Sequence, residues 1–507
     1  MHIDLLSSLL LLLASTTAAH NGHRHQVPHR TKTAPAKPHP TKFSHYLFRF
    51  TSANGPVNTS DILSSLQPYG FDMSHLSHTF SESMNGFSAL MSDHCVDILK
   101  DMVTPNGVQI EPVVTIKRRM QPNPRATTTV NATRTTAIST RTRGHSTTDA
   151  RSDSRLVRFE PAADVMFVIP PERLQGRDAW QDDATWGLQR ISQRDPIAGV
   201  TPETPVDTLS FRYHFDESAG EGVDIYVLDS GINTEHVDFG GRATVEYVSK
   251  RIADLEGSAD LGGHGTHTAG SAGSTRYGVA KKANIRGIKI LNVNGTGLSS
   301  DAMAGIEYVI KRHRERRSSP SFRGSVLSLS FGVPLPPDLV ANPSLIAEAP
   351  VLEKGLMAAA AEGIHIVTAA GNENMDACRD SPSRLSRETG LGGKYAASVI
   401  SVGAADVFDR RADFSNWGRC VTTYAPGQDV LSTWIGSDNA THVGDGTSMA
   451  APHVAGLVAY LLGVRPDLRD DVLGMKNLIM NTAGKGVIQN VADDSDRKLV
   501  AYNGVAG

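Results

Sequence analysis

Cysteine is scarce in this chain of 507 residues, which contains only three. Cys95, Cys378 and Cys420 cannot make a disulfide scaffold, and an odd number leaves one thiol outside any internal pair. Aromatic residues make up 6% of the chain, and 50 Lys and Arg oppose 53 Asp and Glu, so neither sign of charge dominates. This balance excludes the strongly basic composition of many nucleic-acid-binding proteins, and we expect no nucleic-acid partner.

Long hydrophobic runs are also lacking, since none approaches the roughly 18 apolar residues that a membrane span requires. A short apolar run extends from Leu5 to Ala14 and is followed by small residues up to Ala19. This pattern is typical of a cleaved secretory signal, so residues 1–19 are predicted to be a signal peptide. We expect no membrane partner and a secretory-pathway protein, extracellular or, as the alternative, vacuolar.

Composition divides the next part of the chain into three segments. Residues 20–42 are rich in His and Pro and are predicted to be a disordered linker. Residues 43–116 have the order strand–helix–strand–strand–helix–strand, which predicts a small α+β ferredoxin-like domain. Residues 117–183 are dominated by Thr, Arg and Ser and begin with the basic triplet Lys117–Arg119, so they are predicted to be an extended linker and processing region.

Within the small domain, residue patterns predict where individual elements begin. Ser60 and Asp93 are predicted to cap the two helices. Val108 to Ile116 is predicted to be the closing strand. The domain also carries four histidines, whose ordinary pKa lies in the range of secretory acidification. They are His45, His75, His78 and His94.

Residues 184–507 alternate buried apolar runs with helical segments. Continuous apolar strands separated by helices predict an α/β fold with a mostly parallel sheet covered on both faces. In such sheets the functional crevice lies beyond the carboxyl ends of the strands. The predicted strands are 223–228, 288–291, 326–329, 364–368 and 399–402, and the predicted helices are 303–316, 351–362, 448–462 and 472–480.

Four polar residues stand at strand ends, glycine-rich turns or helix starts. Asp229 ends a predicted strand, His264 lies in the segment Gly262–Gly270, Asn372 follows another strand, and Ser448 opens an almost wholly apolar helix. Taken singly, each has an ordinary structural explanation as a turn, loop or capping residue. The histidine segment lacks the His-Glu-x-x-His spacing of a zinc site. Together, the order Asp, His, Ser in an open α/β sheet is that of a catalytic triad.

Around these residues the chain resembles the subtilisin-like serine proteases, most closely the fungal proteinase K and cerevisin-like branch. The resemblance runs from Trp186 to Leu462 and includes further shared segments. These are 236–239, 277–280, 414–418 and 425–427. Residues 43–116 are similar to the inhibitory propeptide of that family. The resemblance implies a serine endopeptidase made as a zymogen, acting on polypeptides and inhibited by its own propeptide.

The resemblance also implies roles for the four polar residues. Ser448 would be the nucleophile, His264 the general base and then acid, and Asp229 the carboxylate that orients His264. The oxyanion would be held by the side-chain amide of Asn372 and the backbone N–H of Ser448. A catalytically silent homologue and a free inhibitor domain remain the alternatives to an active zymogen.

The family's substrate-binding segments can be placed on this sequence. Two are edge strands that pair with extended peptide, and a third lines the primary pocket. They are Gly295, Thr296 and Gly297; Ser330, Phe331 and Gly332; and Ala369, Ala370 and Gly371. Because the third segment carries no charge, we expect broad specificity with an apolar or aromatic preference.

No cofactor is expected, and we expect a monomer. Thr422 stands where proteinase K relatives place a calcium-ligating aspartate, so that calcium site is predicted to be absent. Candidate glycosylation sequons begin at Asn58, Asn131 and Asn439. Whether Cys378 pairs with Cys420 is left open by the sequence.

Overall fold

The computed structural model describes residues 42–51, 58–103, 107–122, 129–130, 138–140, 178–201, 209–335, 350–387, 393–491 and 493–505. The predicted signal peptide, the His/Pro-rich linker up to residue 41, most of the second linker and Asn131 lie outside these residues. Phe43–Gly507 form one compact unit.

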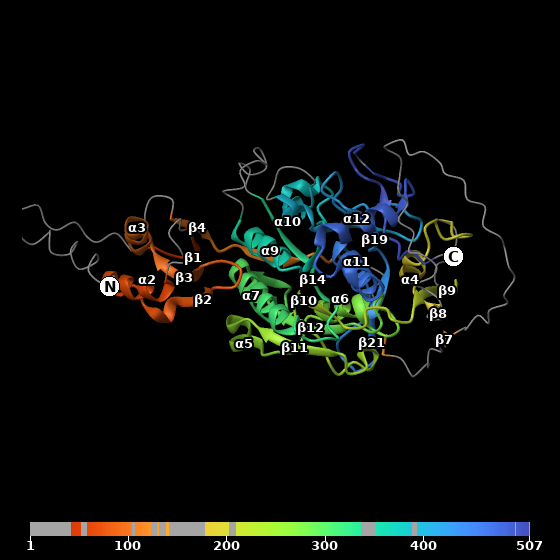
Figure 1. Ribbon diagram of the computed structural model, residues 1–507, viewed down its shortest axis with the longest axis horizontal. Coiled ribbons are helices and arrows are strands. Elements are labelled where there is room, and N and C mark those ends of the chain that lie inside the picture. The colour runs from red at the N-terminus through yellow and green to blue at the C-terminus, as the bar shows by residue number, and fades with distance from the viewer. Residues whose placement is uncertain are drawn as a thin grey trace, which may run out of the picture. The chain divides into compact units, whose positions relative to one another are not determined.

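The first elements build a small four-stranded sheet with two helices. They are β1 (Phe43–Phe50), α2 (Thr59–Leu66), β2 (Leu76–Phe80), β3 (Gly86–Ser92), α3 (Asp93–Met102) and β4 (Val108–Pro112) (Figure 1). The sheet order is β2-β3-β1-β4, with antiparallel neighbours. Phe48 and Phe87 stack in its core at 4.5 Å between ring centroids, where Leu63 and Leu99 join them from the helices. The predicted order of strands and helices in this domain is confirmed.

Three details of the small domain differ from the predictions. Asn58, not Ser60, caps α2, because its side chain accepts the Ser60 backbone N–H at 3.1 Å. Ser92, not Asp93, caps α3. The predicted closing strand divides, because β4 ends at Pro112 and the chain continues into β5 (Thr115–Arg118), which belongs to another sheet.

The main sheet has nine strands in the order β11-β12-β10-β14-β16-β18-β19-β23-β22. Neighbouring strands are parallel except for the final β22–β23 pair, which confirms the predicted mostly parallel sheet. Their bounds are β10 (Val223–Asp229), β11 (Ala243–Val248), β12 (Asn284–Lys289), β14 (Gly324–Leu329), β16 (His365–Ala369), β18 (Ile400–Ala405), β19 (Thr423–Pro426), β22 (Gly484–Lys485) and β23 (Leu499–Val500).

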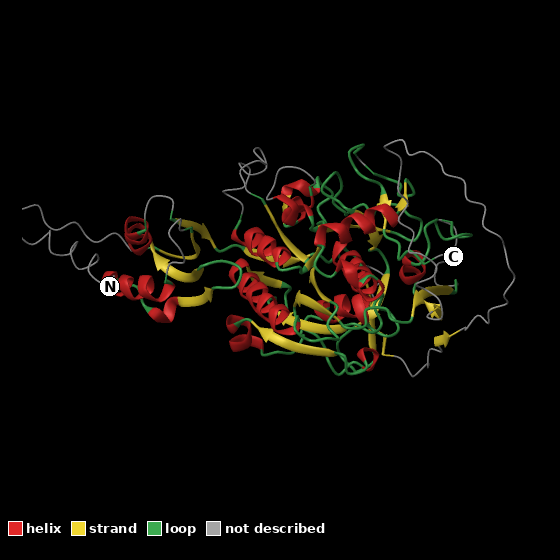
Figure 2. Cartoon of the chain, in the orientation of Figure 1, coloured by secondary structure: helices red, strands yellow, loops and turns green. Residues whose placement is uncertain are grey.

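Side chains alternate between the two faces of this sheet, so each strand contributes to two cores. Ile225 and Val227 of β10 enter the core that contains α6 (His264–Gly273) and α11 (Thr447–Val464). Tyr226 of the same strand enters the other core, which is covered by two further helices. These are α7 (Ser299–Arg316) and α9 (Val351–Ala361). Figure 2 shows the helices of the chain in red and the strands in yellow.

The part of the chain that contains the nine-stranded sheet is the larger domain, and helix α11 is its core helix. Among the described helices it alone is long and apolar enough to cross a membrane, and 94% of it is buried inside the protein. Small residues such as Ala455 and Gly456 permit this close packing, since a Cβ at Gly456 would lie 2.4 Å from the Ala272 carbonyl oxygen of α6. Burial by protein on all sides explains why this helix is hydrophobic around its whole circumference.

The remaining elements lie around this core. The helices are α4 (Trp186–Ile191), α5 (Lys250–Glu256), α10 (Gly393–Ala397) and α12 (Val472–Thr482). The strands are β6 (Thr129–Val130), β7 (Ile138–Thr140), β8 (Asp178–Ala184), β9 (Phe211–Asp216), β13 (Thr296–Leu298), β15 (Phe331–Pro334), β17 (Asp380–Ser381), β20 (Val430–Thr433) and β21 (Ala440–Gly444).

Candidate active site

The predicted catalytic residues lie where strands end and helices begin. Asp229 is the last residue of β10, His264 is the first residue of α6, and Ser448 is the second residue of α11. A helix N-terminus carries unpaired N–H groups and a partial positive charge. The site is therefore suited to hold negative charge close to the Ser448 side chain.

Asp229 and His264 are joined by a hydrogen bond of 2.6 Å between Oδ1 and Nδ1. The same Asp229 oxygen accepts the Ser230 backbone N–H at 2.7 Å, and the Thr268 hydroxyl donates to the other oxygen at 3.4 Å. Both side chains of the pair are buried. This arrangement holds the Nδ1–H tautomer of His264 and directs Nε2 away from the carboxylate.

The Ser448 hydroxyl does not hydrogen-bond to His264 in this structure. Ser448 Oγ instead donates to the Ser330 carbonyl oxygen at 3.0 Å, and His264 Nε2 is buried without a hydrogen-bond partner. Nucleophile–base contacts are often formed fully only in the reacting complex. The site therefore shows a His264 ring oriented by Asp229, with the Ser448 hydroxyl turned toward the Ser330 carbonyl oxygen.

Asn372 is oriented by the start of α11. Its Oδ1 accepts the Thr447 backbone N–H at 2.9 Å and the Thr447 hydroxyl at 2.8 Å. A backbone N–H can only donate, so this contact settles which end of the amide is oxygen. The Asn372 NH₂ group is left to donate elsewhere, as the predicted oxyanion role requires.

A segment of the chain's own N-terminal part lies between the two predicted substrate-binding strands. Strand β5 pairs antiparallel with β13 on one side and with β15 on the other, in the sheet order β13-β5-β15-β17. Gly297 lies opposite Ile116, and Phe331 lies opposite Arg118. The two segments thus pair with an extended peptide, and the start of the predicted linker and processing region belongs to it.

The peptide bond after Arg119 lies next to Ser448. The Arg119 N–H donates to the Ser330 carbonyl at 2.9 Å, and the Arg119 carbonyl oxygen accepts the Ser448 N–H at 3.1 Å. Beyond it, the Gln121 N–H donates to the Asp445 carbonyl at 2.7 Å. Gly446 is required here, because its φ is +146° and a Cβ would lie 2.2 Å from the Arg119 carbonyl oxygen. The chain therefore passes continuously through the candidate active site.

The Arg119 side chain is buried, with 7% of it exposed, and forms ion pairs with two carboxylates. Its Nη1 pairs with Glu373 Oε1 and its Nη2 with Asp380 Oδ2. The pocket that receives this side chain also includes Gly332, where a Cβ would lie 2.7 Å from Arg119 Nη2. Ala369, Ala370 and Gly371 themselves carry no charge, but these two acidic residues follow them in the chain and surround the Arg119 guanidinium. The apolar or aromatic preference stays a prediction.

Each carboxylate is held by the surrounding protein. Glu373 Oε2 accepts the Asn416 side-chain amide at 3.0 Å and the Asn372 backbone N–H at 2.9 Å. Asp380 lies on β17, which pairs with β15. Burial raises the pKa of Asp380 to about 7, although the positive charge of Arg119 acts in the opposite direction. Neither residue stands out in the sequence, because acidic residues after a strand are ordinary loop residues.

Comparison with known proteins places this geometry in a family. A family model described as "Subtilase family" matches residues 220–502. The chain belongs to the subtilase family. The matched region contains the Asp229, His264, Asn372 and Ser448 positions described above.

Individual relatives of this subtilase are fungal proteins. Subtilisin-like protease 3 of Saccharomyces cerevisiae is 41% identical over 333 residues, covering 64% of this chain and 62% of the relative. Cerevisin of the same yeast is 39% identical over 338 residues, covering 64% of this chain and 47% of the relative. The chain thus spans less than two thirds of the length of these relatives.

One solved structure supports the same fold assignment. The crystal structure of a cold-adapted subtilisin-like serine proteinase matches with a TM-score of 0.50 and 31% identity. The match covers 64% of this chain and 100% of the other. The larger domain therefore has the subtilisin-like α/β fold.

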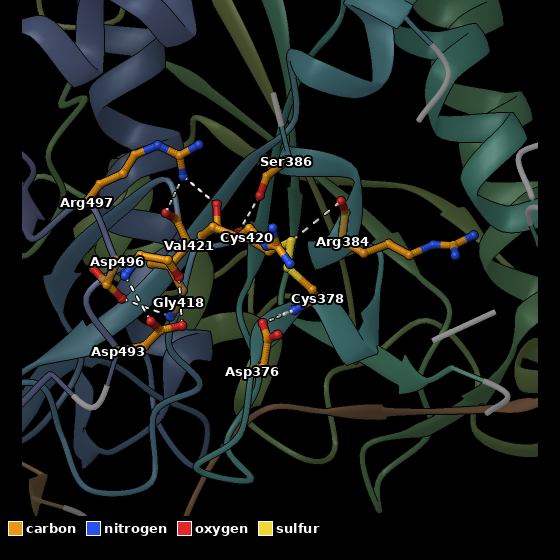
Figure 3. Close-up of a disulfide and its surroundings, with 12 residues drawn as sticks. Asp376, Cys378, Arg384, Ser386, Gly418, Cys420, Val421, Asp493, Asp496 and Arg497 are labelled. Atoms are coloured by element: carbon orange, nitrogen blue, oxygen red, sulfur yellow. Dashed lines mark hydrogen bonds between the residues drawn. A yellow bond between two sulfur atoms is a disulfide. The ribbon is translucent and has the colours of Figure 1, made fainter. Parts of the chain in front are cut away.

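The subtilase domain contains a disulfide close to the acidic pocket, which settles the pairing that the sequence left open. Cys378 and Cys420 are bonded, with Cα atoms 5.2 Å apart (Figure 3). Asp376 accepts the Cys378 N–H at 2.9 Å, and Arg497 donates to the Val421 carbonyl at 2.8 Å. The bond fixes the short 3₁₀ turn that immediately precedes Asp380. The third cysteine, Cys95, is a buried free thiol of the small domain.

The environments of His267, close to His264 in the chain, and of Thr422 are also defined. His267 is buried, and its Nε2 lies 3.1 Å from the carbonyl oxygens of Val430 and His442. Burial first, and His442 second, lower the pKa of His267 to about 3. The Thr422 hydroxyl is buried and accepts the Ser401 N–H at 3.1 Å. The absence of a calcium site at this position stays a prediction.

Two of the candidate glycosylation residues lie in the described part of the chain. Asn58 is exposed at the start of α2 but accepts the Ser60 N–H through its side chain. Asn439 is half-buried, and its Oδ1 accepts the Ser437 hydroxyl at 2.9 Å. Their use for glycosylation stays a prediction.

Proposed function

We propose that this protein is a serine endopeptidase made as a zymogen that cleaves its own chain between Arg119 and Met120. The observation that supports this most directly is the Arg119 carbonyl oxygen, which accepts the Ser448 N–H at 3.1 Å. The flanking residues are held as an extended strand between β13 and β15. A peptide bond in this position is bound as a substrate is bound.

In the proposed reaction, Ser448 Oγ attacks the Arg119 carbonyl carbon while His264 Nε2 accepts the hydroxyl proton. Asp229 stabilises the resulting imidazolium through Nδ1. The Ser448 N–H and the Asn372 amide stabilise the oxyanion. His264 then gives the proton to the Met120 nitrogen as the peptide bond breaks. Water hydrolyses the Arg119 ester in the reverse sequence and regenerates Ser448.

The Ser448 hydroxyl must first leave the Ser330 carbonyl oxygen, which it contacts at 3.0 Å. A rotation about its Cα–Cβ bond is the smallest change that achieves this. The unpartnered, buried Nε2 of His264 is the acceptor that the proposal requires. Polypeptides with the same extended backbone would enter the cleft after the N-terminal part has left.

We propose that residues 43–116 act as the intramolecular inhibitor, with a ferredoxin-like fold supported by the sheet order β2-β3-β1-β4. Glu307 of α7 accepts the N–H groups of Ser81, Glu82 and Ser83 at 2.5–3.0 Å. Glu111 accepts the Val351 N–H at the start of α9 through both oxygens, at 3.0 and 2.9 Å. These contacts hold the small domain while β5 occupies the cleft.

We further propose a monomeric protein of the secretory pathway, with either an extracellular or a vacuolar destination. The apolar run before Ala19 and the disulfide support passage through an oxidising compartment. The absence of a proteinase K-type calcium site at Thr422 stays part of the proposal.

The test is expression of the full chain and of Ser448→Ala, followed by N-terminal sequencing of the larger domain. The wild-type chain is expected to yield Met120 as a new N-terminus, and the variant is expected to keep the Arg119–Met120 bond. Asp97→Asn changes an exposed carboxylate of α3 and serves as the control for processing. Cleavage of the variant at this bond in purified form, or no labelling of Ser448 by a sulfonyl fluoride, would contradict the proposal.

A further inference from the structure

The two acidic residues around Arg119 belong to the subtilase domain, whereas the arginine belongs to the segment that the proposed self-cleavage removes. Asp380 has no exposed surface, and Glu373 is 39% exposed. Among the described residues, Arg119 is the only cation with which Asp380 forms an ion pair. When the N-terminal part leaves, Asp380 would therefore remain a buried carboxylate without a cation.

Such a carboxylate is costly in its charged form, so it either takes up a proton or pairs with a positive charge that enters the pocket. We propose that this pocket selects arginine in polypeptide substrates, with Asp380 and Glu373 as the specificity-determining residues, so that the enzyme cleaves after arginine. This inference rests on the proposed peptidase function. It replaces the apolar or aromatic preference expected from the sequence.

The geometry favours arginine over lysine. The guanidinium uses its two terminal nitrogens for two different carboxylates, Nη1 for Glu373 and Nη2 for Asp380. A planar fork can contact both at once, whereas a lysine offers a single ammonium group at the end of its stem. Lysine substrates should therefore be cleaved, but less efficiently than arginine substrates.

Groups of the subtilase domain itself hold both carboxylates of the pocket. Asn416 holds Glu373 Oε2 at 3.0 Å and the Ala370 carbonyl oxygen at 2.9 Å. Asp380 is held by the pairing of β17 with β15 and by the disulfide at Cys378. Gly332 supplies space, because a side chain there would meet both Asp380 and Arg119.

The residues before Arg119 provide a matched substrate for the test. Ile116 is buried, in contact with the core that includes Phe331, while Lys117 is exposed. The mature enzyme is assayed with acyl-Ile-Lys-Arg-Xaa-nitroanilides in which Xaa is Arg, Lys, Gln, Leu or Phe. We expect kcat/KM for Arg to exceed that for Gln, Leu and Phe by about 10²- to 10³-fold, with Lys between them.

Variants then connect this preference to the two carboxylates. Asp380→Asn should lower the Arg-to-Leu ratio of kcat/KM by about 10²-fold, and the more exposed Glu373→Gln by about 10-fold. Glu221→Gln is the matched control, because this exposed carboxylate lies before β10, at the opposite end of the strand from Asp229. The Arg-to-Leu ratio of kcat/KM for Glu221→Gln should equal that of the wild-type enzyme.

A second measurement covers the case in which Asp380→Asn fails to fold. Arg119→Leu and Arg119→Lys change only the inhibitory segment, and the rate of self-cleavage should fall about 10²-fold for Leu and less for Lys. Faster cleavage of Leu or Phe substrates than of Arg substrates would overturn the inference while leaving the peptidase function intact. Cleavage of no member of the series would instead contradict the proposed function.

Discussion

The backbone N–H of Ser448 donates a hydrogen bond of 3.1 Å to the carbonyl oxygen of Arg119. This contact places a peptide bond of the chain at the N-terminus of α11, where the proposed oxyanion is stabilised. It also defines which side chain enters the acidic pocket. The proposed self-cleavage and the proposed arginine preference therefore both rest on the register of β5 between β13 and β15.

The first prediction concerns the nucleophile and the oxyanion site. Ser448→Ala should reduce peptide hydrolysis by roughly 10⁶-fold, because the nucleophile and the base act as one unit. Asn372→Ala should cost about 10²–10³-fold, since the Ser448 N–H remains as a donor. The comparison requires kcat/KM values measured on folded, processed protein. Because Ser448→Ala is not expected to process itself, its linker is cleaved with an added protease. Equal losses in the two variants would contradict the role of Asn372.

The second prediction is a pH dependence of arginine selectivity. Burial raises the pKa of Asp380 to about 7, while Arg119 acts against the shift. This value applies with Arg119 in place, so the pKa of Asp380 is higher once the N-terminal part has left. The carboxylate becomes neutral as the pH falls through its pKa, and its attraction for arginine is lost toward acid. The ratio of kcat/KM for Arg and Leu substrates should therefore fall about 10-fold from pH 8 to pH 5. Effects of pH on steps that both substrates share cancel in this ratio.

Asp380→Asn provides the control for this pH dependence. The amide does not titrate, so the Arg-to-Leu ratio of the variant should be nearly constant over the same range. A ratio that falls equally in both proteins would show that another group controls selectivity.

The third prediction concerns release of the small domain in acid. Burial first, and His78 second, lower the pKa of His45, while Asp301 opposes and Arg251 reinforces the shift. Because the lowered pKa favours neutral His45, its contribution to the docked state is lost as the pH falls below about 6.5. His45→Gln should therefore move release of the cleaved domain to lower pH.

Measurement of the pH at which the cleaved domain dissociates from the wild-type chain and from His45→Gln checks this sign. His94→Gln is the control, because His94 is exposed at the start of α3.

The fourth prediction concerns calcium. The Thr422 hydroxyl is neutral, buried and hydrogen-bonded to Ser401, so a chelator should change the Tm of the mature enzyme by less than about 2 °C. Thermal unfolding with and without a calcium chelator measures this. A fall of many degrees would contradict the predicted absence of a proteinase K-type site, unless the ion is found at another position.

The fifth prediction concerns the disulfide. Cys378 and Cys420 are separated by 42 residues, so replacing both with Ser should lower the free energy of unfolding by roughly 2–4 kcal/mol. Since Asp380 follows Cys378 closely, the Arg-to-Leu selectivity should fall as well. Cys95→Ser removes a thiol of the small domain and should leave the mature enzyme unaffected. Unchanged stability of the double variant would contradict the structural role of the bond.

Much of the fold could be predicted from local patterns. The apolar run before Asp229 predicts a buried strand, and the structure contains β10 at Val223–Asp229. The small, apolar residues after Ser448 predict a buried helix, and α11 is that helix. The patterns that predict these two elements are local, because the side chains that share a face of a strand or helix are only a few residues apart in the chain. The order of Asp229, His264 and Ser448 then indicated the chemistry of the site.

The charge of the primary pocket and the place of the inhibitory segment were decided by tertiary structure. Arg119 contacts Glu373 and Asp380 from 254 and 261 residues away along the chain. The chain leaves the small sheet after Pro112, and β5 then pairs with the edges of β13 and β15 in the larger domain. Hydrogen bonding between such distant edges leaves no periodic signal in the segment itself. The sequence by itself therefore determined the triad order and the α/β core, while only the folded chain determined which side chain enters the pocket and which charges surround it.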